Sequence, residues 1–386
     1  MYNRTLVFGS ACAGILLFGA SIVSLGTVNA YLTTKFSLES MAVGSLAALL
    51  PFGILAGSLL FGPIVDRYGY RLPLIIATLM ILGGFEAIAF TDSFAVIQFA
   101  FFLIGLGGGV INGGTSALVA DISSEGKGAS LSLLGVFFGV GALGMPALTG
   151  ILLQSASYET IVASLGLGAL IPAGLFASIV FPPPKQAQGF PLKKGLSMLK
   201  HPALLLLSFA LFFQSGLEGM ANNWGTMYLQ QHLRMSVGDS LIGLTVLGAA
   251  LTFARVLMGW LLKRFRPSSI LLSCIALAFS GGLALRLATT PWMAVTGMAL
   301  MGFGFAPVFP VVLGFIADLF AELSGTAFGI ALVIALAGNT FLNYLVGAFS
   351  DWGGITVYPL IHVAATIALT VLVLFARRKL PSHANG

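Results

Sequence analysis

Two carboxylic acids, Glu218 and Glu86, lie deep inside apolar stretches of this chain. A charged group is costly within hydrocarbon, so such residues usually mark a path for ions or solutes. Gln214, Glu218 and Asn222 are spaced four residues apart, which puts them on one face of a helix. Amides provide paired donors and acceptors that suit hydroxyl groups. The spacing therefore predicts proton exchange at a carboxyl group beside a site for a polar solute.

The segment after Glu218 adds Asn223 and Trp224, and an indole can stack on the apolar face of a sugar ring. The same segment contains three glycines, Gly216, Gly219 and Gly225. We expect the helix to bend or break there. Two roles stay open for Glu218. It either couples its protonation to solute binding, or it remains charged and accepts hydrogen bonds from solute hydroxyls or from Asn222.

Other polar residues in apolar stretches are secondary candidates for the same site. Substrate contacts and bonds between helices are both open for Asn112 with Ser116, for Asn339 with Asn343, and for Asn29. Glu86 either bonds a neighbouring helix or extends its carboxylate towards the membrane surface. If it does neither, it is the second candidate for carrying the proton. We expect Arg255 to bond backbone carbonyls or Asp318.

The composition indicates that this protein resides in a lipid bilayer and not in water. Of 386 residues, 58% are hydrophobic and 8% are charged, whereas a soluble domain carries about 25% charged residues. The net charge of +6 arises from basic residues in short loops, so we expect no nucleic-acid partner and a lipid bilayer instead. The histidines lack metal-ligand spacing and no phosphate-binding loop occurs, so we expect no metal site, no cofactor and no enzyme.

Apolar runs long enough to cross about 30 Å of hydrocarbon recur along the whole chain. They predict an all-α integral membrane protein with twelve transmembrane helices in two pseudo-symmetric six-helix bundles. The expected spans are 5–33, 41–65, 72–91, 93–120, 128–154, 158–181, 203–230, 238–262, 268–289, 291–320, 324–350 and 355–378. We divide the chain into an N-terminal bundle (1–181), a linker (182–202) and a C-terminal bundle (203–386).

Basic residues are concentrated on one side of the predicted spans. That side includes both termini and the linker with Lys185, Lys193, Lys194 and Lys200. Lysine and arginine are retained in the cytoplasm, so we expect both termini there, in a multi-pass protein of the plasma (inner) membrane.

The two halves repeat in a single ungapped register. The matching pairs include Gly62 with Gly259, Arg67 with Arg264, Asp121 with Asp318, Gly128 with Gly325 and Gly141 with Gly338. Two parallel six-helix repeats are typical of secondary transporters, which hold their solute near the midplane between the halves.

Residues 62–71 read GPIVDRYGYR. This segment resembles the signature G-x-x-x-D-R-x-G-x-R of the major facilitator superfamily, and its second copy, beginning at Gly259, has Lys263 in place of the acid. The resemblance implies a cytoplasmic gate. In that gate Asp66 caps a helix start while Arg67 or Arg71 bridges to Asp121. The open alternative is that these charges only anchor the loop at the lipid headgroups.

Within that superfamily the chain is most similar to the fucose:proton symporter group of sugar transporters. The similarity lies in residues 302–310, GFGFAPVFP, in residues 139–146, GVGALGMP, and in the glycine run that begins at Gly105. Asn112 stands where that group has an acid and Ser116 where it has an asparagine. The first span lacks the group's aspartate.

These observations together predict a secondary active transporter for a neutral, sugar-like solute, working by alternating access and as a monomer. The coupling ion is expected to be the proton, with sodium as the open alternative. The rival interpretations are an exporter of amphipathic drugs or lipids by proton antiport, and a receptor that keeps the fold without transport.

Overall fold

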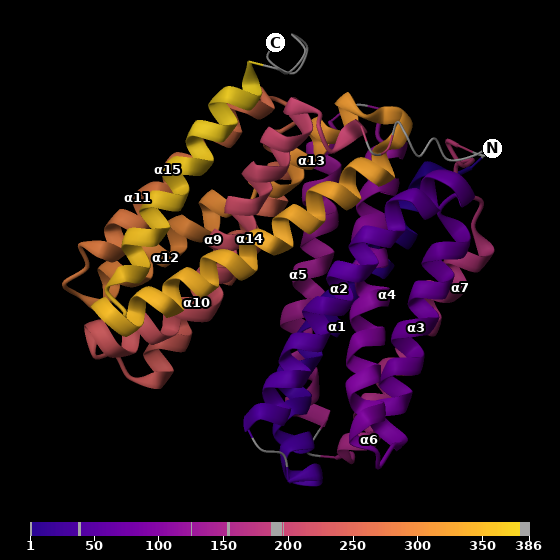
Figure 1. Ribbon diagram of the computed structural model, residues 1–386, viewed down its shortest axis with the longest axis horizontal. Helices are drawn as coiled ribbons and strands as arrows, with labels where there is room; N and C mark the ends of the chain where they lie inside the picture. Colours follow the sequence, from indigo (N-terminus) through magenta and orange to yellow (C-terminus); the bar gives the residue numbers. More distant parts are fainter. Residues whose placement is uncertain are drawn as a thin grey trace. The chain divides into compact units, whose positions relative to one another are not determined.

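The computed structural model describes residues 2–37, 40–124, 126–152, 155–186, 195 and 197–378. Every regular element in these residues is a helix (Figure 1). Within these residues, twelve segments are long and apolar enough to cross a membrane, and each overlaps one predicted span. The prediction of an all-α, twelve-span protein is therefore confirmed.

The chain forms two compact units. Unit 1 comprises Met1–Ile122, Leu134–Leu192 and Ala321–Gly329, and unit 2 comprises Ser123–Leu133, Lys193–Phe320 and Ile330–Gly386. Each unit thus takes one short segment from the other half of the sequence, and these two segments occupy corresponding places in the repeat. Two parts of the predicted linker, 187–194 and Leu196, lie outside the described residues.

Unit 1 is arranged around α4. Its helices are α1 (Arg4–Phe36), α2 (Ser40–Tyr68), α3 (Arg71–Phe90), α4 (Phe94–Ile122), α5 (Lys127–Leu152), α6 (Tyr158–Gly168) and α7 (Leu170–Ser178). The helix α4 packs along α2, α3 and α1, and α2 lies close enough that a Cβ at Gly105 or Gly109 would overlap the α2 backbone (Figure 1). The glycine run of α4 therefore permits close helix contact.

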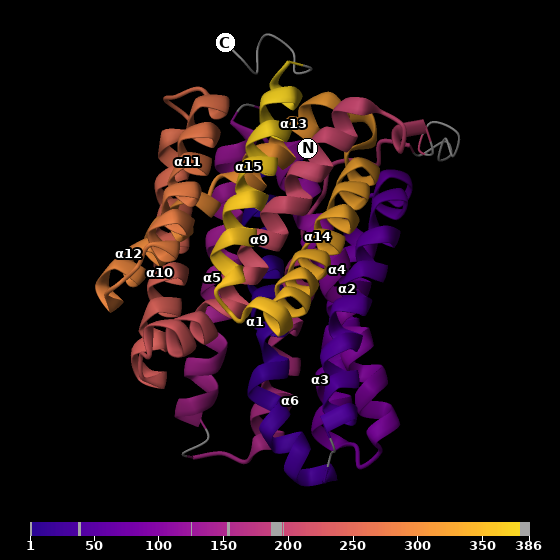
Figure 2. The same ribbon diagram turned by 60° about the vertical axis from the view of Figure 1, so that its left-hand side comes forward.

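Unit 2 has the corresponding order. Its helices are α9 (Pro202–Leu233), α10 (Val237–Leu261), α11 (Pro267–Arg286), α12 (Pro291–Phe305), α13 (Val308–Leu319), most of α14 (Ser324–Gly353) and α15 (Val357–Arg377), and the 3-10 turn η1 (Ala321–Leu323) precedes α14. Here α12 packs against α10 and α11, while α9 packs against α15 (Figure 2). The 3-10 turn η1 and the beginning of α14 belong to unit 1, and the remainder of α14 belongs to unit 2.

Three predicted spans differ from the structure in continuity. The tenth is two helices, α12 and α13, separated at Ala306 and Pro307, because Pro310 has no N–H to bond the Ala306 carbonyl. The sixth is likewise split, into α6 and α7. The predicted break in the seventh is wrong, since α9 continues from Pro202 to Leu233.

The glycines of α9 serve close packing instead of a break. A Cβ at Gly219 would overlap the side-chain amide of Asn339, and one at Gly216 would press on the carbonyl oxygen of Gly338. These glycines let α14 approach α9 at the level of Glu218, which is where the polar residues of the two helices meet.

Candidate functional site

An ion pair lies between α9 and α10 within unit 2. An Arg255 guanidinium nitrogen is 3.9 Å from Glu218 Oε1. Arg255 is 9% exposed, whereas the Glu218 side chain is 29% exposed. A buried guanidinium needs a counter-charge, and the partly exposed Glu218 supplies one. The expected partner Asp318 is instead paired with Lys127 Nζ at 2.6 Å.

A cluster of amides joins α9 to α14 beside this pair. Asn343 Oδ1 accepts hydrogen bonds from Asn223 Nδ2 and from Trp224 Nε1, both at 3.0 Å. Asn343 Nδ2 donates to Asn339 Oδ1 at 3.0 Å, and Asn339 Nδ2 donates to the Ser215 carbonyl at 3.2 Å. We call these residues, Asn223, Trp224, Asn339 and Asn343, the amide cluster. Its internal bonds orient the indole and the exposed amide of Asn223.

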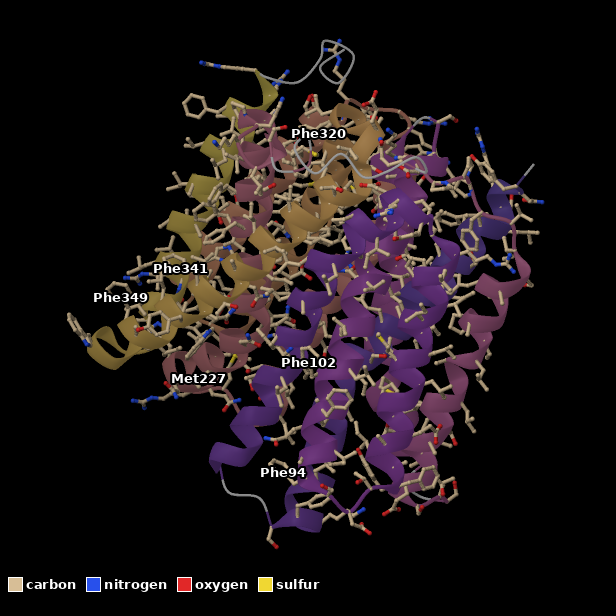
Figure 3. The ribbon with its side chains drawn as sticks, turned by 45° about the vertical axis from the view of Figure 1, so that its right-hand side comes forward. Phe94, Phe102, Met227, Phe320, Phe341 and Phe349 are labelled. Carbon is tan, nitrogen blue, oxygen red and sulfur yellow. The ribbon has the colours of Figure 1, made fainter. Side chains whose placement is uncertain are left out.

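Aromatic rings also join the two helices. The Phe212 and Phe341 ring centroids lie 5.8 Å apart, and Phe341 is about half exposed along α14 (Figure 3). These rings therefore pack across the same pair of helices that the amide cluster joins.

The predicted polar face of α9 is only partly realised. Gln214 is fully buried, and its Nε2 donates to the Phe305 carbonyl at 3.2 Å. That carbonyl ends α12 and so lacks a helical partner, which Gln214 replaces. Asn222 is exposed and donates to the backbone carbonyl of Glu218 at 2.8 Å. Gln214 thus stabilises the α12–α13 break, while Asn222 remains accessible.

The other candidates belong to unit 1 or lie outside the described side chains. Asn112 is half-buried and Ser116 buried, both on α4. Glu86 lies on α3 with its Oε1 buried against Gly166 of α6, and this oxygen has no hydrogen-bond partner among the described residues. The side chain of Asn29 is not described.

Asp66 caps a helix, and that helix is α14. Its Oδ2 accepts from the Thr326 amide at 2.9 Å and from Thr326 Oγ1 at 2.7 Å, and Oδ1 accepts from the Gly325 amide at 3.2 Å. Asp66 is 1% exposed. The carboxylate thus satisfies otherwise unpaired amides at the positive end of the helix dipole.

Asp121 is bonded by residues other than the predicted arginines. Its Oδ1 accepts from Lys185 Nζ at 2.6 Å and from Ser324 Oγ at 2.8 Å, and its Oδ2 accepts from the Tyr70 hydroxyl. We call Asp66, Tyr70, Asp121, Lys185 and the α14 start (324–326) the latch.

The predicted bridge from Arg67 or Arg71 to Asp121 is replaced. Arg71 donates to the Ala177 carbonyl, and Arg67 lies over the Tyr68 ring, with its Cζ 5.1 Å from the ring centroid. Both arginines are exposed. Lys185, from a segment distant in sequence, occupies Asp121 in their place.

Burial raises the pKa of Tyr70 well above its ordinary value, and the neighbouring Asp121 carboxylate raises it further. The phenol therefore stays protonated and donates to Asp121.

Sequence reasoning missed Tyr70, Lys185 and Ser324 as members of the latch. The one available signal was Ser324-Gly325-Thr326 at the start of a predicted span, because serine and threonine favour helix starts.

The latch has a counterpart in unit 2. Lys127 holds the same place in the repeat as Ser324, and Asp318 holds the place of Asp121. Lys127 Nζ bonds Asp318 at 2.6 Å, as Ser324 Oγ bonds Asp121. Each acid at the end of one span therefore holds the start of a span from the other half of the sequence.

Twelve apolar helices in two repeated sets, with a charged pair and amides inside one of them, define a polytopic membrane transporter. The sequence matches the Major Facilitator Superfamily over residues 10–331 and again over 220–386. The chain belongs to this superfamily, which is one of transporters and not of enzymes.

Curated relatives cover nearly the whole chain. The 3-(3-hydroxy-phenyl)propionate transporter of Escherichia coli K12 is 28% identical, over 97% of this chain and 94% of the relative. The glucose/mannose transporter GlcP of Bacillus subtilis is 22% identical, over 90% of this chain and 88% of the relative.

Solved structures share the fold at low identity. The Escherichia coli fucose:proton symporter FucP superposes with a TM-score of 0.78 at 18% identity, over 96% of this chain and 98% of that one. The proton:xylose symporter XylE gives a TM-score of 0.78 at 17% identity, over 98% and 96%. The similarity to sugar symporters expected from the sequence is confirmed at the level of the fold.

The Asp66 cap predicts a loss of stability on substitution. Asp66→Asn would turn one acceptor into a donor facing the Thr326 amide, so we expect the free energy of unfolding to fall by about 1–3 kcal/mol. The measurement is the thermal unfolding midpoint of the purified protein. The control is Lys263→Gln, at the exposed repeat counterpart, which we expect to leave the midpoint unchanged. Equal midpoints for Asp66→Asn and wild type would contradict the cap.

Proposed function

We propose that this protein imports a neutral, sugar-like solute together with a proton, and that Glu218 carries the proton. The observation that carries the proposal is the Glu218–Arg255 pair, which adjoins the amide cluster along α9. A site with one acid and one base in apolar surroundings changes its net charge whenever the acid gains a proton.

Coupling follows from the charge on the pair. With Glu218 ionised, the carboxylate and the Arg255 guanidinium neutralise one another. When a proton binds Glu218, Arg255 loses its counter-charge, and oxygen atoms of a solute can then accept hydrogen bonds from the guanidinium. Departure of the solute makes the ionised pair favourable again and expels the proton. Proton and solute therefore cross together.

The solute chemistry is supported by the exposed groups of the site. Asn222 and Asn223 are exposed, and the Trp224 indole is half-buried and anchored by Asn343. Amides suit hydroxyls, and the indole face suits the C–H face of a pyranose. The glucose/mannose relative and the fold shared with fucose and xylose symporters agree with this choice.

A second candidate solute is a hydroxyaryl carboxylate. The buried Arg255 favours it, because a guanidinium binds a carboxylate through two parallel hydrogen bonds. The relative that transports 3-(3-hydroxy-phenyl)propionate points the same way. In that case the substrate's carboxylate would take the place of the ionised Glu218 beside Arg255.

Alternating access requires the latch to open and close. Asp66 and Asp121 hold the start of α14 in the state described here. Three further residues of unit 1, Asn112, Ser116 and Asn29, remain candidates for solute contact.

The basic side of the spans supports an inner-membrane protein with both termini in the cytoplasm. We propose that the monomer is the transporting form.

Glu218→Gln tests the coupling. We expect the variant to lose accumulation of sugar driven by a pH gradient and to keep exchange of internal for external sugar, because the amide carries no exchangeable charge. The measurement is uptake of labelled glucose, xylose and fucose into proteoliposomes. The matched control is Glu86→Gln, the other acid buried in a span, which should still accumulate sugar. Undiminished accumulation by Glu218→Gln would reject the role, and its loss in Glu86→Gln alone would move it to Glu86.

The choice of solute is tested by ligand-induced thermal stabilisation, since a ligand of the folded state raises the unfolding midpoint. We expect the sugars to stabilise the protein and Trp224→Phe to bind them roughly fivefold more weakly, for the loss of about 1 kcal/mol. The control is Trp292→Phe, at a tryptophan that is 82% exposed. Stabilisation by 3-(3-hydroxyphenyl)propionate and not by sugars would establish the second candidate instead.

A further inference from the structure

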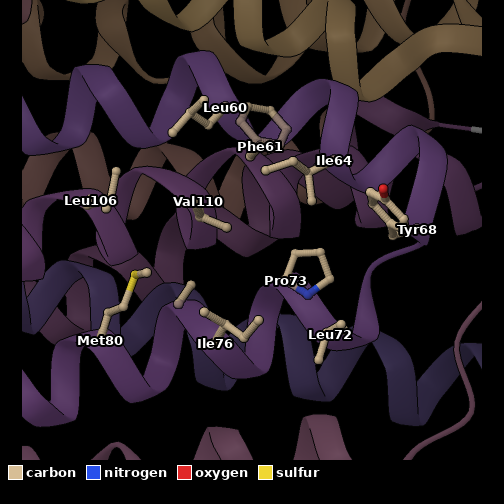
Figure 4. Close-up of a pocket in the computed structure, with 11 residues that line it drawn as sticks. Leu60, Phe61, Ile64, Tyr68, Leu72, Pro73, Ile76, Met80, Leu106 and Val110 are labelled. Atoms are coloured by element: carbon tan, nitrogen blue, oxygen red, sulfur yellow. The ribbon is translucent and has the colours of Figure 1, made fainter. Parts of the chain in front are cut away.

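A groove with a volume of about 170 Å³ lies in unit 1 between α2, α3 and α4 (Figure 4). Its walls are almost wholly apolar and include Leu60, Ile64, Leu72, Ile76, Met80 and Val110. Leu60, Leu72 and Ile76 are each about half exposed, so the groove opens on the outer face of these helices. All three helices are candidate membrane spans, and an exposed apolar face on such helices is suited to contact with lipid.

The groove is elongated along the helices. Tyr68 lies at one end, and Met80 and Leu106 lie at the other (Figure 4). From Leu72 to Met80 the helix α3 rises about 12 Å, so the groove accommodates an extended hydrocarbon segment of that length.

The end with Tyr68 carries positive charge. Arg67 is exposed, with its Cζ 5.1 Å from the centroid of the Tyr68 ring, and Tyr68 is 60% exposed. The adjacent acid Asp66 is buried and bonded to the start of α14, so it is not directed to this surface. A guanidinium and a phenol hydroxyl at the end of a span form a recognition pair for phosphate, and both are favoured at the membrane interface.

We infer that this groove binds one anionic phospholipid, with an acyl chain along α3 and the phosphate at Arg67 and Tyr68. Positive charge at one end of a chain-shaped apolar groove complements the phosphate and acyl chain of such a lipid, whatever solute the protein transports. Anionic lipids of the cytoplasmic leaflet attract basic residues that lie near the membrane surface. The bound lipid would brace the α2–α3 connection, which carries Asp66 and Tyr70 of the latch.

The test is native mass spectrometry of the purified protein in micelles with phosphatidylglycerol or phosphatidylcholine of identical acyl chains. We expect the wild type to retain phosphatidylglycerol several-fold more than phosphatidylcholine. Arg67→Gln should remove this preference, and Val110→Phe, which fills the floor of the groove, should lower retention of both lipids.

Matched controls separate the groove from general effects. Arg264→Gln changes the repeat counterpart of Arg67, which lies over Trp260 with its Cζ 4.7 Å from the ring centroid. Val96→Phe makes the same enlargement on an exposed part of α4. Both should retain lipid as the wild type does. Because Arg67 is exposed, we expect Arg67→Gln to fold, so this variant tests the proposal even if Val110→Phe fails to fold.

Four results would overturn the proposal. The first is equal retention of the two lipids by the wild type. The second is an equal loss in Arg67→Gln and Arg264→Gln, and the third is wild-type retention in a folded Val110→Phe. Binding of a hydrophobic cation in place of phosphatidylglycerol, abolished by Val110→Phe, would likewise overturn it and assign the groove to amphipathic cations.

Discussion

A guanidinium inside an apolar helix bundle constrains everything around it. Arg255 is buried on α10, and the carboxyl group of Glu218 on α9 is paired with it at 3.9 Å. Because charge is costly in hydrocarbon, we propose that the protonation of Glu218 is linked to the presence of solute oxygens near Arg255. The α9 glycines and the bonds of Asn343 bring α14 to the same stretch of α9, so the amide cluster and the charged pair share that helix.

The repeat explains the latch and also its asymmetry. Asp66 caps the start of α14, while its counterpart in the second half, Lys263, is an exposed base that cannot cap α5. A lysine cannot accept hydrogen bonds from backbone amides. Among the described contacts, Asp318 bonds Lys127 at the start of α5, whereas Asp66 accepts three hydrogen bonds from Gly325 and Thr326 at the start of α14 and Asp121 accepts one from Ser324. The start of α14 therefore has a carboxylate cap that Lys263 does not provide for α5.

Hydropathy and the repeat were enough to predict the twelve spans and the transporter class, since both depend on composition and spacing alone. The partners of individual side chains were not predictable in this way. Gln214 faces a carbonyl freed by the α12–α13 break, which depends on a proline in another helix. Lys185 reaches Asp121 from a segment that the sequence identifies only as linker, and so Arg67 is directed to the surface. Such contacts depend on tertiary packing, which helical periodicity does not predict.

The most direct test of the account is the proton movement that accompanies solute entry. Proteoliposomes containing the wild-type protein, with a pH-sensitive dye inside and no imposed gradient, would receive sugar from outside. The account predicts internal acidification that rises with the amount of sugar entering, one proton with each molecule. Sugar entry with no change in internal pH would contradict the coupling of solute to Glu218, although the fold and the superfamily assignment would stand.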